Sequence, residues 1–320
     1  MLAFQPGRIE KLSETVFQTG ESLAPSIPLY MHIVQGSTAS ALIDAGLPQS
    51  RPSIESLIAH AEANGARLRY ACNTHAHHDH IGNLRFVREK YGAAVVATAR
   101  SRRWLEDPEQ NLQEFAFHHP HLLGEPEQLR TELASTFDGS TQVDVLVDES
   151  ITLNLGGGVE LEAFRVDGHL HSELAWFESK SRFLILGDAV TGTSWPFFHG
   201  HVDPKGFRRS LHDLRSFVRD RRVETVAMSH YEPRDASAFL ELLATVEEYL
   251  DEVYETVLAQ FASDAVSLEQ VWRGVCSAMG KERDFRSLGM VAAHLDELVG
   301  EGRLSLAGPE LYVRISTSGR

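Results

Sequence analysis

The stretch NTHAHHDHIGN, residues 73–83, carries four potential metal ligands within six positions: His75, His77, Asp79 and His80. It follows an apolar, strand-like run and precedes an amphipathic segment. We therefore expect a turn at the end of a strand, where alternate side chains point into one space. Imidazole and carboxylate together suit zinc, iron or manganese. The alternative, a solvated polar loop with histidines by chance, fits such dense spacing poorly.

Three later apolar runs also end in a potential ligand. They are VELEAFRVDGH (159–169), RFLILGD (182–188) and VETVAMSH (223–230), which end in His169, Asp188 and His230. A carboxylate directly after a buried strand is costly to bury without a cation. The alternatives are a turn or helix-capping role for Asp188 and a hydrogen-bonded core histidine for His230.

Strand-like and helix-like runs alternate over the first two thirds of the chain, which predicts a layered α/β fold. The segment 100–137 interrupts this series, and we interpret it as an insertion of two or three short helices over one face of the sheet. The expected strands are 29–36, 40–46, 67–75, 93–99, 143–149, 151–155, 159–169, 174–179, 182–188 and 223–230, and the expected helices are 51–64, 80–91 and 204–221.

The character of the sequence changes after residue 231, where strand signals nearly vanish. A long amphipathic helix is expected at about 235–262, followed by helices at 267–279 and 286–300. The run RLSLAGPELYVRI (303–315) then predicts a two-stranded ribbon, so the whole has a winged-helix outline. We expect a catalytic domain at 1–231 and a small, mostly helical, winged-helix-like domain at 232–320.

The acidic balance of the C-terminal part argues against nucleic-acid binding. Residues 231–320 hold 16 acidic and 8 basic residues, whereas a DNA-reading winged helix should be basic. A net charge of −15 over the whole chain also repels a phosphate backbone. We therefore interpret the C-terminal part as a packing or oligomerisation module. Its long helix can support a homodimer, or its apolar face can pack on its own α/β domain.

Composition sets further bounds on the chain of 320 residues, which fits one large domain and a small one. No run approaches the roughly 20 apolar residues of a membrane span, and the N-terminus does not resemble a signal peptide. We therefore expect a cytoplasmic location without membrane contact. The distant Cys72 and Cys276 suit buried small side chains rather than a disulfide framework.

The motif His-x-His-x-Asp-His at 75–80 resembles that of the metallo-β-lactamase superfamily, and the resemblance covers roughly residues 10–231. It implies an αββα sandwich with two metal ions at one edge. By this resemblance, one ion is held by His75, His77 and His169, the other by Asp79, His80 and His230, and Asp188 bridges them. The pair Gly168-His169 matches the family motif and the residues after it depart from it, so His171 is an alternative to His169, which we prefer.

This ligand set is similar to the glyoxalase II and lactonase pattern of the superfamily. It implies a hydrolase in which a hydroxide bridging two divalent ions, zinc or else iron or manganese, attacks a small ester, thioester or lactone carbonyl. Asp79 would orient the hydroxide or relay a proton, and Tyr231 would donate a hydrogen bond to a substrate oxygen. The alternatives are a phosphodiesterase or ribonuclease, a di-iron redox enzyme, and a regulatory protein with a residual site.

Aromatic residues near the expected metal edge are candidates for the wall of an apolar substrate pocket. Ordinary packing between the insertion and the sheet is the alternative. The candidates are Trp104 and Phe115 in the insertion and Trp195, Phe197 and Phe198 after Asp188. Of the histidines nearby, we expect only His199 or His201 to face the site.

Overall fold

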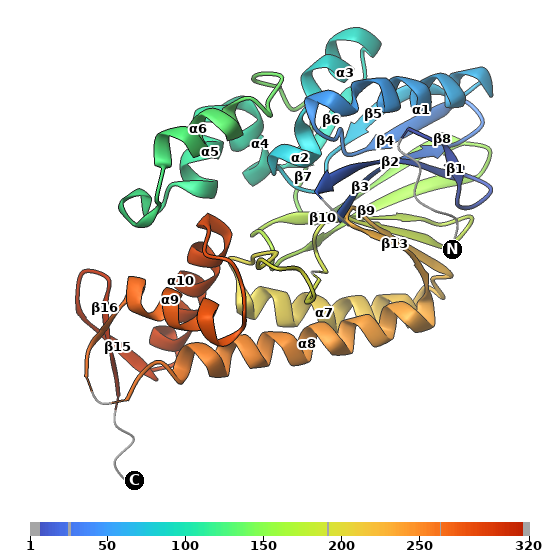
Figure 1. The fold of residues 1–320 in the computed structure, drawn as a ribbon. Helices are drawn as coiled ribbons and strands as arrows, with labels where there is room; N and C mark the ends of the chain where they lie inside the picture. Colours follow the sequence, from blue (N-terminus) through green and yellow to red (C-terminus); the bar gives the residue numbers. More distant parts are fainter. Residues whose placement is uncertain (1–6, 25–26, 191, 263, 316–320) are drawn as a thin grey trace.

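The computed structural model describes residues 7–24, 27–190, 192–262 and 264–315, and two β-sheets lie at its centre (Figure 1). The strands of the first sheet follow the sequence order, antiparallel from β1 to β4 and parallel from β4 to β7. These strands are β1 (Glu10–Lys11), β2 (Val16–Ala24), β3 (Ile27–Gln35), β4 (Ala39–Ile43), β5 (Arg67–Cys72), β6 (Ala94–Thr98) and β7 (Val145–Val147).

The second sheet has the order β13-β12-β11-β10-β9-β8. Only the pairing of β11 with β12 is parallel in this sheet, and α7 (Pro204–Asp220) forms the crossover that a parallel pair requires. Its strands are β8 (Ser150–Gly156), β9 (Val159–Val166), β10 (Glu173–Glu178), β11 (Phe183–Leu186), β12 (Thr225–Met228) and β13 (Tyr231–Asp235).

Three buried clusters define the layers. The facing sides of the two sheets share one cluster, which includes Val34 and Trp176. The outer side of the first sheet packs against α1 (Arg51–Ala63) and α3 (Leu84–Tyr91), and that of the second against α7 and α8 (Ala236–Leu258), which lie side by side (Figure 1). The expected αββα sandwich is therefore confirmed.

Most expected elements are present with shifted ends, and two differences have a clear cause. The helix expected at 80–91 is divided into α2 (His78–Ile81) and α3, because Asn83 turns its side chain to the carbonyl oxygens of Ala45 and Leu47. The strand β2 was not expected, because its polar residues hide the alternation of a strand, yet Gln18 and Thr19 are buried.

The insertion forms three short α-helices, as expected, and covers the edge of the first sheet near α2 (Figure 1). They are α4 (Ala99–Glu106), α5 (Pro108–Ala116) and α6 (Pro126–Ala134). Thr98 and Asp107 cap α4 and α5 through their side chains, which explains why the segment breaks into short helices. Trp104 and Leu105 anchor the insertion in the core of the first sheet.

The C-terminal part contains α9 (Leu268–Ala278), α10 (Phe285–Gly300) and a small sheet of the order β14-β16-β15, formed by β14 (Val266–Ser267), β15 (Leu304–Gly308) and β16 (Leu311–Arg314). The expected ribbon thus gains a third strand, and the winged-helix description remains a prediction. The apolar face of α8 is buried within the chain: Leu243 packs on the second sheet, and Val257 packs with α9 and α10. Of the two alternatives for the long helix, this agrees with the one in which its apolar face packs on the α/β domain of the same chain.

No helix in the described part of the chain has the length and hydropathy needed to span a bilayer. Cys72 and Cys276 are both free and buried, as expected.

We expect Leu250→Ala to lower the free energy of unfolding by about 2–5 kcal/mol, because a fully buried side chain of α8 leaves a cavity. Glu248→Ala, on the exposed side of the same helix, should change it by less than about 0.5 kcal/mol. Urea titration followed by circular dichroism measures both values. Equal losses in the two variants would contradict the burial of this face.

Candidate metal centre

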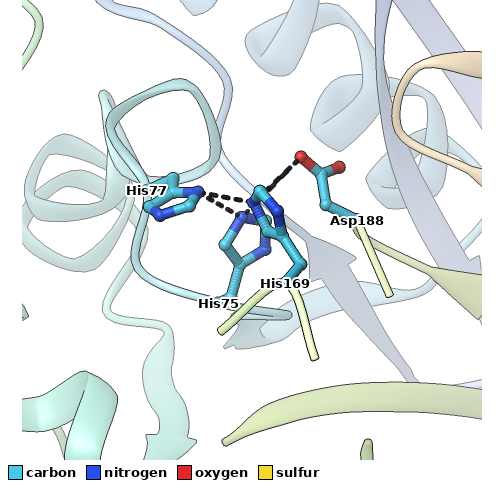
Figure 2. Close-up of side chains that lie close together, drawn as sticks. All are labelled: His75, His77, His169 and Asp188. Atoms are coloured by element: carbon cyan, nitrogen blue, oxygen red, sulfur yellow. Dashed lines mark hydrogen bonds and ion pairs between the residues drawn. The ribbon is translucent and has the colours of Figure 1, made fainter. Parts of the chain in front are cut away.

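Strand ends from both sheets bring the predicted ligands to one edge of the sandwich. The turn after β5 and the short helix α2 carry His75, His77, Asp79 and His80, while His169, Asp188 and His230 follow β9, β11 and β12. Figure 2 shows His75, His77, His169 and Asp188 converging on one space. All seven residues are buried, with exposed fractions of 0–7%.

Hydrogen bonds from buried polar side chains fix the turn after β5. Asp44, at the end of β4, accepts hydrogen bonds from the backbone N–H and the hydroxyl of Thr74, at 2.8 and 2.7 Å. The amide group of Asn73 donates to the carbonyl oxygen of His75 at 2.6 Å, and that of Asn111 in α5 donates to the carbonyl oxygen of Ala76 at 2.7 Å. The turn is therefore held from the first sheet and from the insertion.

Two glycines that precede ligands allow the close approach of the elements. A Cβ atom on Gly187 would lie 2.4 Å from the hydroxyl oxygen of Thr74. Gly168 has a φ of +144°, and a Cβ atom there would lie 2.6 Å from the side chain of Phe207. Only glycine fits either position without displacing its neighbours, so both glycines set the positions of Asp188 and His169.

The first group of ligand atoms fits a single metal ion. Nδ1 of His77 lies 3.1 Å from Nε2 of His75 and 2.8 Å from Nε2 of His169. Oδ2 of Asp188 lies 3.9 and 3.5 Å from the same two nitrogens. A tetrahedral site with Zn–N bonds of about 2.0–2.1 Å separates its ligand atoms by roughly 3.3 Å. These atoms are therefore spaced to surround one ion.

The second group lies beside the first and shares Asp188 with it. Oδ2 of Asp79 lies 3.7 Å from Nε2 of His80 and 3.3 Å from Nε2 of His230. Oδ1 of Asp188 lies 3.6 Å from Nε2 of His80, and Oδ2 of Asp188 lies 3.4 Å from Nε2 of His230. Asp188 thus faces both groups, as a bridging carboxylate would.

The second ring nitrogen of several histidines is held by a fixed oxygen. Nδ1 of His80 lies 2.8 Å from Asp44, and Nδ1 of His169 and of His230 lie 2.8 Å from the carbonyl oxygens of Gly200 and Pro28. Acceptors at Nδ1 favour the tautomer in which Nε2 carries a free lone pair. The imidazoles are therefore oriented to bind a cation inside the cluster.

Burial and neighbouring charges keep part of the imidazoles neutral next to ionised carboxylates. Burial lowers the pKa of His169 to about 4, and burial with the neighbouring imidazoles of His80 and His77 holds the pKa of His75 well below its usual range. Burial also opposes protonation of His80 and His230, but Asp79 and Asp188 raise the pKa of His80 well above its usual range and that of His230 to about 10. Burial alone would raise the pKa of Asp188, but His230, His199 and His80 hold it well below its usual range. Two negative carboxylates enclosed with imidazole lone pairs suit divalent cations.

Orphaned polar atoms support the same conclusion. Nε2 of His80 and Oδ1 of Asp188 are buried and have no hydrogen-bond partner in the described part of the chain. Buried polar atoms normally form hydrogen bonds, so a buried polar atom without a partner requires an explanation. Both atoms point toward the second group, and a metal ion there would satisfy them. The residues present therefore fit a metal centre.

The structure distinguishes among the remaining predicted residues. His169, and not His171, joins the cluster; the side chain of His171 is 41% exposed and forms an ion pair with Asp203. The ring of Tyr231 stacks on Trp195, and its hydroxyl lies against Gly192. The ring of Trp195 lies next to that of His230, with centroids 5.8 Å apart, so Trp195 and the Tyr231 ring stacked on it border the cluster.

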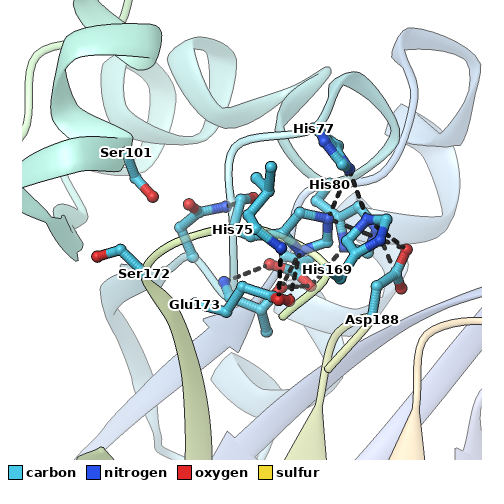
Figure 3. A network of polar contacts seen from close by, with 12 residues as sticks. His75, His77, His80, Ser101, His169, Ser172, Glu173 and Asp188 are labelled. Atoms are coloured by element: carbon cyan, nitrogen blue, oxygen red, sulfur yellow. Dashed lines mark hydrogen bonds and ion pairs between the residues drawn. The ribbon is translucent and has the colours of Figure 1, made fainter. Parts of the chain in front are cut away.

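Three residues near the cluster were not predicted as part of it. Asp44 ends the apolar strand β4, which is the signal that identified Asp188, so the sequence could have shown it. Glu173 lies 3.9 Å from Nδ1 of His75, and burial raises its pKa well above the usual range (Figure 3). His199, expected only to face the site, places Nε2 at 2.7 Å from Asp188 Oδ2 and can join Asp188 and His230 in holding a metal ion.

The segment His199–His201 connects the cluster to the C-terminal part. His199 contacts Asp188, the carbonyl oxygen of Gly200 accepts from His169, and His201 shares a hydrogen bond of 2.8 Å with His294 of α10. His294 lies 3.1 Å from Glu297, which also binds Arg208 of α7. A buried polar chain thus runs from the metal ligands to α10.

Comparisons with known proteins agree with this geometry. A metallo-hydrolase assigned as probable in Bacillus subtilis is 27% identical over 154 residues, which cover 47% of this chain and 54% of that protein. A hydroxyacylglutathione hydrolase of Pelagibacter ubique is 29% identical over 107 residues, covering 30% of this chain and 42% of that protein. The matches therefore span only part of the length of these curated relatives.

A solved structure extends the likeness in fold over nearly the whole chain. The crystal structure of a metallo-beta-lactamase family protein from Thermus thermophilus superposes with a TM-score of 0.74 at 20% identity, covering 95% of this chain and 100% of that one. Residues 30–230 match the sequence profile described as Metallo-beta-lactamase superfamily, and they contain all seven predicted ligands. The protein therefore belongs to the metallo-beta-lactamase superfamily.

Proposed function

We propose that the protein is a dinuclear metal-dependent hydrolase that cleaves a small ester, thioester or lactone, with zinc as the metal and iron or manganese as alternatives. The observation that carries this proposal is the pair of neighbouring buried ligand groups, with Asp188 of the first group 3.6 Å from His80 and 3.4 Å from His230 of the second. Membership of the superfamily and the partial likeness to a hydroxyacylglutathione hydrolase support it.

His75, His77 and His169 would hold one metal ion, Asp79, His80 and His230 would hold the other, and Asp188 would bind both. Two bound divalent cations would supply a water of lowered pKa near neutral pH and polarise the scissile carbonyl. The chain would supply orientation, because Asp44, Gly200 and Pro28 hold the ring nitrogens that face away from the cluster.

Asp79 is the residue we assign to proton handling. Although burial raises its pKa, the imidazoles of His80, His78 and His230 hold it well below the usual range, so the carboxylate is ionised. Its Oδ2 lies 3.3 Å from His230 inside the cluster. With Oδ2 as the ligand atom, the other oxygen of this carboxylate would accept a hydrogen bond from the attacking water and orient it toward the carbonyl carbon.

Tyr231 is the residue we assign to the substrate oxygen. It follows His230 directly, and stacking on Trp195 at an interplanar angle of 13° fixes its ring. A phenol donor at the rim of the cluster would stabilise the negative charge that develops on the carbonyl oxygen.

The phosphodiesterase alternative has less support, because it needs free cations around the metals. Lys205, Arg208 and Arg209, the only basic cluster that the sequence suggested, form ion pairs with Glu301, Glu297 and Asp167 respectively. We also propose that residues 1–231 form the catalytic unit and that residues 232–320 are a unit that packs beside it.

We expect about two equivalents of zinc per chain in protein purified without added metal, measured by elemental mass spectrometry. His80→Ala should retain about one equivalent, because it removes a ligand of one ion only. His212→Ala, which changes an exposed histidine on α7, should retain both. Two equivalents of iron would favour the redox alternative, and no metal uptake on reconstitution would contradict the proposed centre.

We expect the zinc-loaded protein to hydrolyse thioesters, lactones or esters and to lose this activity with a chelator. Tyr231→Phe should lower kcat about 10- to 100-fold with a smaller change in KM, because a hydrogen bond to a developing charge is lost. Tyr91→Phe, on the surface helix α3, serves as the matched control. Hydrolysis of bis(p-nitrophenyl) phosphate with all carbonyl substrates untouched would instead favour the phosphodiesterase.

A further inference from the structure

A cavity of about 530 Å³ lies beside the metal centre, between the insertion and the C-terminal part. Its walls come from α4 and α5, from the loop after His169 and from α10. Figure 3 shows two of its lining residues, Ser101 and Ser172, on one side of the histidine cluster. The volume is in the range of small-molecule sites.

The cavity adjoins the metal ligands directly. The rings of Trp104 and Phe115, which line it, contact His77 with centroids 6.2 and 4.2 Å apart. Leu170, another lining residue, follows His169 in the chain. The end of the cavity nearest the metals is therefore apolar and suits the carbon chain of a substrate whose carbonyl lies at the centre.

Most charged groups of the cavity are already paired. Glu114 accepts hydrogen bonds from Arg103 at 3.1 Å and from the indole N–H of Trp104 at 2.7 Å. His119 lies 2.6 Å from Glu310, and His171 lies 3.4 Å from Asp203. These pairs leave little net charge for a ligand to meet.

Arg100 differs from the other cations that line the cavity. It forms no hydrogen bond or ion pair with any residue that the structure describes, and it acts on Glu114 only by longer-range attraction. It lies four residues before Trp104 on α4, so the Cβ atoms of the two residues are one helical turn, about 6 Å, apart. Asp296 lies on the wall formed by α10; burial raises its pKa, and the nearby His119 opposes this.

We propose that this cavity binds the tail of the substrate and that the tail is an apolar chain ending in a carboxylate, which Arg100 binds. This inference rests on the hydrolase proposed above and names its substrate class. Guanidinium and carboxylate match in geometry and charge, and the exposed Arg100 has no competing partner among the described residues.

Three p-nitrophenyl esters with equal chain length test the proposal on the zinc-loaded protein: the octanoate, the suberate monoester and the ω-amino octanoate. We expect the highest kcat/KM for the suberate monoester. Arg100→Gln should lower the ratio of suberate to octanoate kcat/KM about 10- to 100-fold. Arg102→Gln is the matched control; it lies on the same helix, is paired with Glu106 at 3.0 Å and does not line the cavity.

An equal ratio in the wild type and in Arg100→Gln would overturn the proposal. The proposal would also be overturned if the protein preferred the ω-amino ester and Asp296→Asn abolished that preference, because the cavity would then bind a cationic tail. If the protein hydrolyses none of the three esters and no thioester or lactone, the proposed function fails, and the cavity is tested separately by saturation-transfer NMR with free suberate. A signal in the wild type and Arg102→Gln that is lost in Arg100→Gln supports the carboxylate site, and equal signals in all three proteins refute it.

Discussion

The burial of two ionised carboxylates among five imidazoles is the constraint on which the rest of this structure depends. Enclosing an unpaired charge costs several kcal/mol, so such a cluster is stable only with compensating partners. The surroundings supply part of them through Asp44, Gly200 and Pro28, which bind the outward ring nitrogens. The nitrogen and oxygen atoms that face into the cluster have no such partners. Nε2 of His80, for example, forms no hydrogen bond with the described residues, and a bound cation would compensate such atoms.

The sequence predicted the residues of the cluster well, because strand ends have a readable signal. An apolar run that stops at Gly-Asp or Gly-His identifies Asp188 and His169 without knowledge of the fold. Asp44 follows the equally apolar strand β4 and carries the same signal, but it was missed; its contacts with His80 and Thr74 come from the fold and not from the sequence pattern. The αββα layering followed from the same strand pattern together with the family resemblance.

Other features could not be predicted, because they depend on contacts between distant segments. The sequence placed Phe198 with the possible pocket residues, yet it is buried in the C-terminal core. His199 and His201 are two positions apart and face different neighbours, Asp188 and His294. Side-chain directions repeat regularly along a helix or a strand, but not along an irregular segment, so the sequence does not show which way each histidine points. The cavity next to Trp104 likewise exists only because α10 closes it.

The hydrogen bond between His201 and His294 joins the C-terminal part to the segment that supports the proposed metal centre. Loss of α10, by proteolysis or by a truncated gene, would leave both sheets and every predicted ligand in the chain. It would nevertheless free His199–His201, which contacts Asp188 and His169. A shortened protein would therefore keep its secondary structure while the proposed metal centre lost the support of this segment, so an intact fold by circular dichroism would not imply an intact centre.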